Sequence, residues 1–279
     1  MEQLTEIQEQ ILNGHLLGDG FLNRETINNN ARFIIAHKST DKNYLLWTAK
    51  HFENFIYKTG LSASSQFDTR THKTYYQNRI STKADPIFTE YHNQWYPEGK
   101  KIVPIDLILT PQIISVWFCD DGNVRYDNIR KNSALKFATD GFSEKDVIFL
   151  ADQLQNMYGN KIAMKPKGDK FVITCTTASA INTILNDIYP VFPPLKRKFD
   201  QIINNPLVSL PQILDDSPPE QINFYEKPFE YKPPCIYCQS ENIVKRRPDN
   251  GKQLYSCKEC GKYFKDIKDY IVIPKLARK

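Results

Sequence analysis

Two segments about a hundred residues apart end on the same pair of residues. Asp19 precedes Gly20 at the end of ILNGHLLGDGFL, and Asp121 precedes Gly122 near the end of IISVWFCDDGNV. Each segment is an apolar stretch of helical length, and a glycine that follows such a helix is commonly a left-handed cap. A carboxylate is unfavourable there, because the C-terminus of a helix carries partial negative charge. The repeated placement predicts that the two carboxylates meet at a cation.

Small residues in the two segments allow their helices to pack closely. Gly14 and Gly18 lie four residues apart in the first helix, and Ser115 offers a comparable small site in the second. Such packing brings Asp19 and Asp121 to the same end of the interface between the helices. Two carboxylates this close repel each other unless a proton or a metal neutralises them.

Magnesium is the cation that best fits a pair of carboxylates. It prefers oxygen ligands and binds through one or two carboxylates together with phosphate oxygens and water. Two such ions at a phosphodiester are typical of metal-assisted hydrolysis. The pair of aspartates therefore indicates a metal-dependent reaction on a phosphodiester.

The sequence around each motif predicts the same order of elements. In the first half we expect a helix over 5–19, a hairpin with its turn at Asn28–Asn30, a helix over 41–60 with Asp41 as N-cap and Gly60 as C-cap, strands near 62–69 and 73–82, and a helix over 85–97. In the second half we expect a helix over 110–121, strands near 123–127 and 133–139, a helix with Ser143 as N-cap, strands near 161–166 and 170–175, and a helix near 177–189. The predicted fold is α+β, with two pseudo-symmetric αββαββα repeats and antiparallel sheets.

The chain divides into four predicted parts. Residues 1–105 form the first repeat, residues 106–205 the second, residues 206–233 a proline-rich linker, and residues 234–279 a cysteine-containing module. The chain carries a formal net charge of +5, and 11 Lys and Arg against 5 Asp and Glu fall within residues 235–279. This distribution permits a polyanionic partner without requiring one.

Four of the six cysteines form two C-x₂-C pairs separated by eighteen residues: Cys235 with Cys238, and Cys257 with Cys260. Four thiolates satisfy tetrahedral Zn²⁺, and the residues between the pairs predict a strand, a turn and a strand. We therefore expect a small zinc ribbon with one structural Zn²⁺, whose folding energy comes from the metal. A redox dithiol is disfavoured because no thioredoxin-like βαβ pattern surrounds either pair.

The cysteine usage indicates a reducing compartment. No apolar run approaches the roughly 20 residues of a membrane span, and the N-terminus is polar and acidic, unlike a signal peptide. We expect a soluble intracellular protein without a membrane partner. The cytoplasm of a bacterium, a phage-infected host and an organelle all fit the sequence.

The motifs LNGHLLGDG (12–20) and ISVWFCDDG (114–122) resemble the two motifs of the LAGLIDADG homing endonucleases in their single-chain form, and the resemblance extends over 9–205. It implies that the motif helices form a pseudo-twofold interface and that two four-stranded sheets make a saddle over double-stranded DNA. It also implies a monomer that cuts both strands at a long pseudo-palindromic site with two or more Mg²⁺ ions and leaves 3′ overhangs. Val116 is a departure, since that motif position is usually small.

The resemblance also implies the residues of the active site. Counting back from Gly122, it assigns the metal to Asp121 rather than Asp120, which supports the helix end or makes an outer hydrogen bond. Metal binding is thereby assigned to Asp19, Gly20, Asp121 and Gly122.

The catalytic lysines are implied by two further matches. GKKIVP implies Lys101, with Lys100 as an alternative. FPPLKRKF implies Lys198, with Lys196 and Arg197 nearby. A solvated basic patch is the simpler interpretation of either cluster, and both interpretations stay open.

Residues that read DNA are expected on the polar faces of the strands, alternating with apolar neighbours. The candidates are Arg24, Arg32, Gln77, Arg79, Arg125, Lys136, Lys165 and Lys170. Arg246 and Arg247 are candidates in the zinc module, for which a structural or protein-binding role is the alternative.

Two other functions fit the same scaffold. The first is an intron RNA maturase, for which intron RNA is the partner. The second is a catalytically silent DNA-binding regulator. The presence of both Asp19 and Asp121 favours the nuclease, because their mutual repulsion brings no benefit without a metal.

Overall fold

The computed structural model describes residues 3–207, 235, 237–238, 240, 242–246 and 254–265. Residues 208–233 of the predicted linker and Arg247 lie outside this described part. The chain separates into two compact units, Met1–Phe224 and Tyr225–Lys279. Within the described residues, no helix combines the length and the apolar character that crossing a membrane requires.

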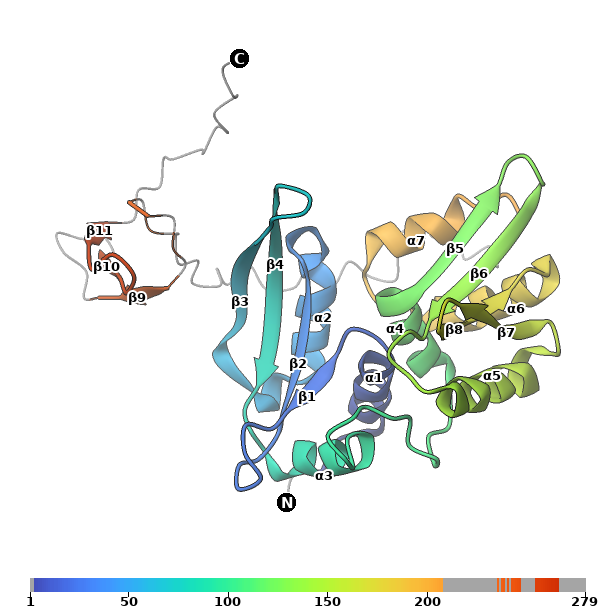
Figure 1. Ribbon diagram of the computed structural model, residues 1–279, viewed down its shortest axis with the longest axis horizontal. Coiled ribbons are helices and arrows are strands. Elements are labelled where there is room, and N and C mark those ends of the chain that lie inside the picture. The colour runs from blue at the N-terminus through green and yellow to red at the C-terminus, as the bar shows by residue number, and fades with distance from the viewer. Residues whose placement is uncertain are drawn as a thin grey trace, which may run out of the picture. The chain divides into compact units, whose positions relative to one another are not determined.

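The first unit contains the expected αββαββα order twice, followed by one more helix (Figure 1). The elements of the first repeat are α1 (Glu6–Leu17), β1 (Phe21–Asn23), β2 (Arg32–Lys38), α2 (Lys42–His51), β3 (Ile56–Asp68), β4 (Lys73–Thr82) and α3 (Pro86–Trp95). Those of the second are α4 (Pro111–Asp121), β5 (Gly122–Asp127), β6 (Asn132–Ala138), α5 (Glu144–Tyr158), β7 (Ile162–Lys167), β8 (Lys170–Cys175) and α6 (Ala178–Ile188), with α7 (Lys196–Ile203) after it. Short 3₁₀ turns occur at Ser39–Asp41, Glu53–Phe55 and Tyr189–Val191.

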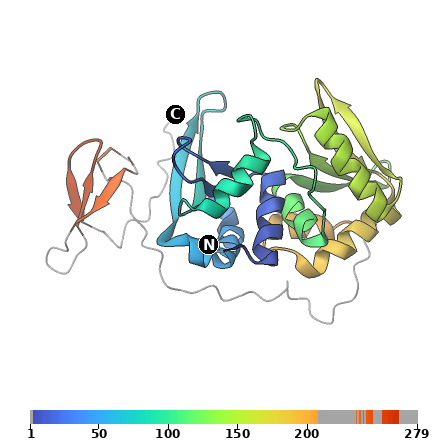
Figure 2. The ribbon, with the colours of Figure 1, turned by 90° about the horizontal axis from the view of Figure 1, so that it is seen from below.

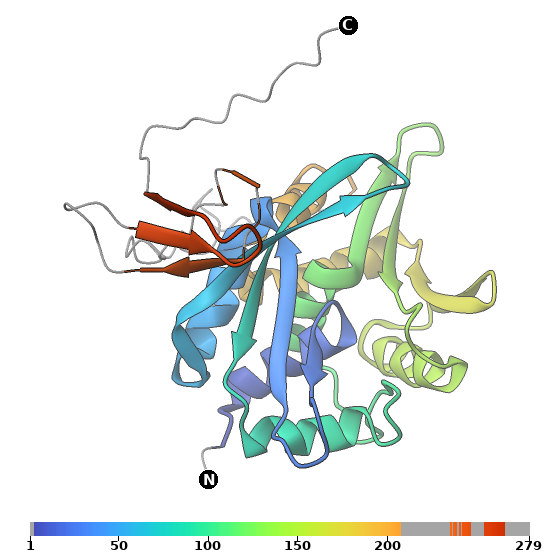
Figure 3. The same ribbon diagram turned by 60° about the vertical axis from the view of Figure 1, so that its left-hand side comes forward.

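Both repeats build the same four-stranded antiparallel sheet. The strand order is β1-β2-β4-β3 in the first repeat and β5-β6-β8-β7 in the second. The central helices α1 and α4 lie side by side between the two sheets (Figures 1 and 2). The β3–β4 hairpin is long and extends past β1 and β2 (Figure 3). The predicted α+β fold is therefore confirmed.

Local capping explains where several helices begin. Thr5 and Gln8 form a capping box at the start of α1, and Ser143, the expected N-cap, forms a capping box with Asp146 at the start of α5. Thr110 accepts a hydrogen bond from the backbone N–H of Ile113 and so caps α4, the second motif helix. These caps set the direction in which the two motif helices enter the core.

The helix predicted over 41–60 is shorter than expected. It ends at His51, and a 3₁₀ turn leads directly into β3, which includes Gly60. Phe52 and Phe55 are both buried, and the turn directs their rings onto Phe33 and Phe88 respectively, at centroid distances of 5.5 and 5.1 Å. Burial of these two rings outweighs continuation of the helix.

The second unit contains a three-stranded antiparallel sheet in the order β11-β10-β9. Its strands are β9 (Ile243–Lys245), β10 (Leu254–Cys257) and β11 (Tyr263–Lys265). Tyr255 and Phe264 stack with a centroid distance of 5.6 Å and form a small core together with Ile243, Cys235 and Cys257. Cys119 and Cys175 are buried in the core of the first unit, as expected for small apolar residues.

Candidate active site

Glycines of α1 allow the two motif helices to approach closely. A Cβ on Gly14 would lie 2.6 Å from the Cβ of Val116, and a Cβ on Gly18 would lie 2.3 Å from the Cβ of Asp120. Both distances are far below van der Waals contact. The valine that departs from the family motif is thus accommodated by the glycine that faces it.

The small residue expected on α4 has a different role. Ser115 is buried, and its hydroxyl donates to the carbonyl of Val191 at 3.3 Å rather than marking the crossing with α1. Gly18 and Asp120 are the seventh residues of the two motifs, so this pair lies across the pseudo-twofold axis. The bulk of Asp120 fits because Gly18 has no side chain.

The motif glycines are not left-handed caps. Neither Gly20 nor Gly122 has a positive φ, and Gly122 has φ −79° and ψ 157°, which is strand geometry. A Cβ on Gly20 would lie 2.7 Å from the Cβ of His15, and one on Gly122 would lie 2.3 Å from Cδ2 of Phe118. Glycine is required here because the chain turns back against its own helix, not because of its φ angle.

Asp120 is fully buried at the end of the helix pair and accepts four hydrogen bonds. Its Oδ2 accepts from the backbone N–H of Asp19 at 3.2 Å and lies 2.9 Å from Nδ1 of His15. Its Oδ1 accepts from the Tyr44 hydroxyl at 2.8 Å and lies 3.1 Å from Nε2 of His37. Burial opposes the negative charge, but the two histidines and their hydrogen bonds outweigh it and hold the pKa of Asp120 below its usual range. The carboxylate therefore stays ionised and fixes the backbone that presents Asp19.

Asp19 and Asp121 are more accessible than Asp120 and remain electrostatically unbalanced. Burial and then repulsion by Asp120 raise the pKa of Asp19 above its usual value, although its side chain is 45% exposed. Burial, followed by repulsion from Asp19 and Asp120, raises the pKa of Asp121 to about 7 despite the opposing charges of Lys101 and Lys198. The three carboxylates thus act on one another, and the nearby cationic side chains only partly offset the burial and repulsion of Asp19 and Asp121. A divalent cation with oxygen ligands fits this deficit.

Each repeat places one lysine on the carbonyl of its own motif glycine. The Lys101 ammonium donates to the Gly20 carbonyl at 2.9 Å, and the Lys198 ammonium donates to the Gly122 carbonyl. Burial lowers the pKa of both amines, that of Lys101 to about 8. The two lysines occupy equivalent positions beside the acids.

The alternatives to these lysines are placed elsewhere. Lys100 is exposed, Lys196 pairs with Asp200 at 2.7 Å, and Arg197 pairs with Asp41 at 2.8 Å. Asp41 occupies the N-cap position of α2 as expected, but its carboxylate accepts from Arg197 instead of capping the helix. The geometry therefore favours Lys101 and Lys198.

Three of the candidate DNA-contacting residues lie on one polar face of the first sheet. Arg79 of β4 lies opposite Ala36 of β2. Arg32 and Gln77 are an even number of residues from these two along the same strands and so share their face. Arg32 also pairs with Glu25 at 3.1 Å.

Four further candidates share the corresponding face of the second sheet. Lys136 of β6 lies opposite Asn123 of β5 and opposite Thr174 of β8. Arg125 is two residues from Asn123 along β5 and therefore shares its face. Lys170 is four residues from Thr174 along β8, and Lys165 is two residues along β7 from the partner of Thr174. The alternation expected from the sequence therefore gathers these basic side chains on one face.

Arg24 lies off the strand faces where it was expected, and Arg246 lies in the cysteine module, as its place in the sequence requires. Arg24 follows the end of β1, and its guanidinium donates to the carbonyls of Asn29, at 2.8 Å, and Ile27. It therefore closes the loop between β1 and β2 and does not lie on a strand face. Arg246 directly follows β9 and donates from Nε to the Ser256 hydroxyl at 2.9 Å.

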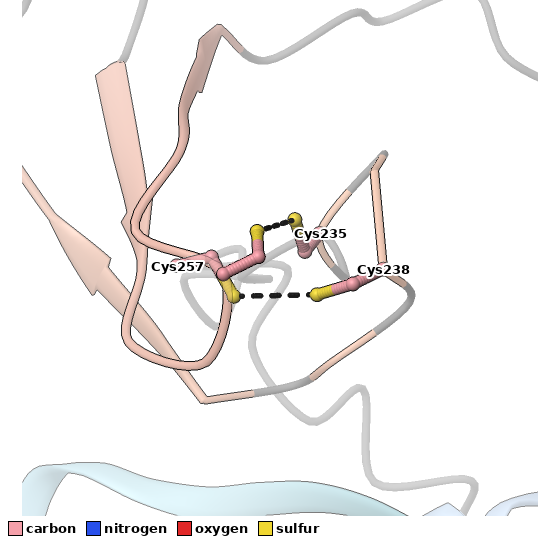
Figure 4. Close-up of side chains that lie close together, drawn as sticks. Cys235, Cys238 and Cys257 are labelled. Carbon is pink, nitrogen blue, oxygen red and sulfur yellow. Dashed lines mark hydrogen bonds between the residues drawn. The ribbon is translucent and has the colours of Figure 1, made fainter.

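The sulfur atoms of the four cysteines of the second unit all lie within 4.8 Å of one another. Figure 4 shows the side chains of Cys235, Cys238 and Cys257 pointing toward one another. The sulfur atoms of Cys235 and Cys260 are 3.6 Å apart, and those of Cys238 and Cys257 are 3.5 Å apart. Ligands about 2.3 Å from a tetrahedral zinc ion are about 3.8 Å from each other. Backbone N–H groups of Cys260 and Glu259 lower the pKa of Cys257 to about 6. The spacing of the four sulfur atoms fits a zinc ion.

His15, His37 and Tyr44 were not identified from the sequence as parts of the site. His15 gave one signal, since it is an ionisable residue inside an otherwise apolar motif helix and is fully buried in the structure. His37 and Tyr44 gave none, because their common partner Asp120 is 83 and 76 residues away along the chain.

Comparison with known proteins gives one family match and several relatives. Residues 9–182 match the LAGLIDADG DNA endonuclease family. The chain is 27% identical over 164 residues to DNA endonuclease I-ChuI of Chlamydomonas applanata, which covers 56% of this chain and 74% of that protein. It is 27% identical over 162 residues to cytochrome b mRNA maturase bI2 of Debaryomyces hansenii, which covers 57% of this chain and 60% of the maturase.

The fold is also that of a solved structure. The homing endonuclease I-WcaI bound to its DNA recognition sequence aligns with a TM-score of 0.63 at 22% identity. The alignment covers 71% of this chain and 88% of the other.

Proposed function

This chain belongs to the LAGLIDADG DNA endonuclease family, whose match spans residues 9–182, and we propose that it is a site-specific endonuclease that cuts both strands of double-stranded DNA. Both repeats lie in one chain, so we propose that it acts as a monomer. The expected target is a long pseudo-palindromic site, and the expected products carry 3′ overhangs.

The observation that carries the proposal is the convergence of the two motifs: Asp120 accepts from the backbone N–H of Asp19, and the charges of Asp19 and Asp120 act on Asp121, whose pKa is raised to about 7. An acid whose ionisation is opposed by neighbouring carboxylates is stabilised when a divalent cation binds there. Asp19 and Asp121 would hold Mg²⁺ through their carboxylates. The carbonyls of Gly20 and Gly122 would join them only by exchanging the lysine ammonium that each accepts from for the metal ion. When bound, Mg²⁺ supplies an activated water and stabilises charge on the phosphodiester.

The other residues of the site orient the metal-binding acids and offset negative charge on the phosphate. Asp120 holds the backbone N–H of Asp19 and so orients the first acid. The amines of Lys101 and Lys198 lie beside the motif glycines, where they offset the negative charge that develops on a phosphate.

The polar faces of the two sheets supply the DNA contacts in this proposal. Arginine and lysine side chains there bind phosphates or guanine edges, and glutamine suits adenine. The cysteine module binds one structural Zn²⁺, and its basic residues add a second contact with DNA that raises the effective concentration of the first.

The proposal is tested by cleavage and binding of a target selected from a randomised DNA library in the presence of Mg²⁺. Asp19→Asn and Asp121→Asn should each abolish cleavage of both strands while leaving DNA affinity within a few fold. Asp140→Asn is the control, since Asp140 is on the surface in an ion pair with Lys167. Undiminished cutting by either site variant would refute the two-acid mechanism.

Maturase activity is the second candidate, because relatives of this chain include the cytochrome b mRNA maturases of two yeasts. Splicing of a host intron depends on RNA binding and not on the paired acids. An intron whose splicing is stimulated equally by the wild-type chain and by Asp121→Asn would assign this activity to the chain as well.

A further inference from the structure

His37 lies between two acids at the end of the motif helices. It is 5% exposed and lies near the end of β2. Its Nε2 is 3.1 Å from Oδ1 of Asp120, whereas its Nδ1 is 3.9 Å from Oδ2 of Asp19, which is too long for a hydrogen bond. The three side chains offer ligand atoms within 4.8 Å of one another.

Asp120 has no remaining capacity as a ligand. A carboxylate accepts about four hydrogen bonds, and Asp120 receives four, including those from the backbone of Asp19 and from Tyr44. It therefore orients the His37 ring by accepting a hydrogen bond from Nε2, the nitrogen that faces away from Asp19. Nδ1 then faces the Asp19 carboxylate, and a metal ion bound there would displace the proton from Nδ1.

An imidazole held by a carboxylate on one nitrogen and open on the other is the usual arrangement of a metal-binding histidine. A nitrogen and an oxygen that are each about 2.1 Å from one octahedral metal ion are about 3.0 Å apart when they are neighbours. Closing the observed 3.9 Å to that distance needs a small shift of Asp19, whose side chain is 45% exposed.

The second repeat lacks this arrangement. Leu22, two residues after Gly20, pairs with Phe33 of β2. Val124, two residues after Gly122, pairs with Leu135 of β6. Four residues further along, His37 and Thr139 therefore occupy equivalent positions. Thr139 is buried and donates its hydroxyl to the carbonyl of Phe171 at 2.6 Å. It offers no nitrogen to a metal.

We propose that Nδ1 of His37 and the carboxylate of Asp19 bind one divalent transition-metal ion, such as Mn²⁺, in the first repeat, whereas the second repeat binds a metal through oxygen atoms alone. Imidazole favours Mn²⁺ and later first-row ions over Mg²⁺. The two repeats thus bind metal unequally. The inference rests on the proposed nuclease for the use of this metal in cleavage, but the binding itself is independent of it.

The test is pulsed electron paramagnetic resonance on the tag-free full chain, with the cysteine module saturated with Zn²⁺ and one equivalent of Mn²⁺ added. A directly bound imidazole gives ¹⁴N modulation of the Mn²⁺ echo. We expect this modulation in the wild type and its loss in His37→Gln, together with at least about a tenfold weaker Mn²⁺ affinity. His51→Gln is the matched control, since His51 lies on α2 with its Nδ1 bonded to the Trp47 carbonyl.

Two results would overturn the inference: no ¹⁴N modulation in the wild type at saturating Mn²⁺, or unchanged modulation in folded His37→Gln. Asp19→Asn provides a second variant that keeps His37 in place, and it should also weaken Mn²⁺ binding about tenfold. A chain that binds Mn²⁺ through nitrogen but cuts no DNA would keep this inference and lose the proposed function. A chain that cuts DNA without nitrogen-bound Mn²⁺ would do the reverse.

Discussion

Replacing Asp120 by asparagine tests whether this buried carboxylate organises the site. Asparagine keeps the shape of the side chain but offers one acceptor oxygen and an NH₂ donor. Two of the four groups that now donate to Asp120 would therefore face a donor. A buried donor without an acceptor costs about 1–3 kcal/mol, and removing one partner of a buried charge pair costs about 3–5 kcal/mol. We expect Asp120→Asn to lower the free energy of unfolding by about 3–5 kcal/mol.

For a unit of this size, that loss lowers the melting temperature by about 6–20 °C. Thermal denaturation followed by far-ultraviolet circular dichroism at pH 7 measures the shift. Asp140→Asn is the matched control, because Asp140 pairs with Lys167 on the surface and its side chain is 43% exposed. That variant should change the free energy of unfolding by less than about 0.5 kcal/mol. If Asp120→Asn shifted the melting temperature no more than Asp140→Asn, the organising role would be rejected.

The difference in stability between wild type and Asp120→Asn should depend on pH in a defined way. The pKa of Asp120 is lower in the folded chain than the usual 3.8, so its ionised form stabilises the folded state at all pH values above about 4. This stabilisation is lost as the pH falls from there through the lowered pKa. The difference between wild type and Asp120→Asn should therefore shrink below about pH 4. It should also shrink as the pH rises through the pKa of His37, which burial lowers but Asp120 raises further, to above its usual 6.5.

Three other predictions concern different parts of the chain. Gly18→Ala should destabilise the first unit by about 1–3 kcal/mol in chemical denaturation, because its Cβ would overlap that of Asp120. Gly141→Ala, with open space around it, should change the free energy of unfolding by less than about 0.5 kcal/mol. Equal effects of the two variants would argue against the tight helix crossing. Asp121→Asn should stabilise the metal-free chain increasingly as the pH rises from 4 to 7, because the pKa of Asp121 is raised to about 7 and its ionisation over that range destabilises the wild type. Mg²⁺ should reduce the difference in melting temperature between the two proteins. A metal-free variant less stable than wild type at pH 8 would contradict the raised pKa. Native mass spectrometry should find one zinc ion per chain and none in Cys257→Ser, and a zinc content well below one would count against the structural zinc site. Removal of residues 235–279 should weaken DNA affinity and flatten its dependence on salt. An unchanged salt slope would count against a DNA contact by the cysteine module.

The sequence alone was sufficient for the features that depend on local pattern and spacing. The two Asp-Gly motifs, the order of helices and strands, the capping box at Ser143 and the paired cysteines are all encoded within short stretches. Strand alternation also placed Arg79 and Lys136 on the polar faces of their sheets, because side chains alternate with a period of two. Each of these properties follows from neighbouring residues.

Only the tertiary structure decided the features that depend on contacts between distant residues. Asp120 is ionised and central because His15, 105 residues away, and His37, 83 residues away, converge on it. The helix α2 ends early because Phe52 and Phe55 are buried against the core. Gly18 is needed because Asp120 faces it across the helix crossing. Packing in three dimensions selects among locally acceptable conformations and partners, and no pattern within a short stretch of sequence records which partner is chosen.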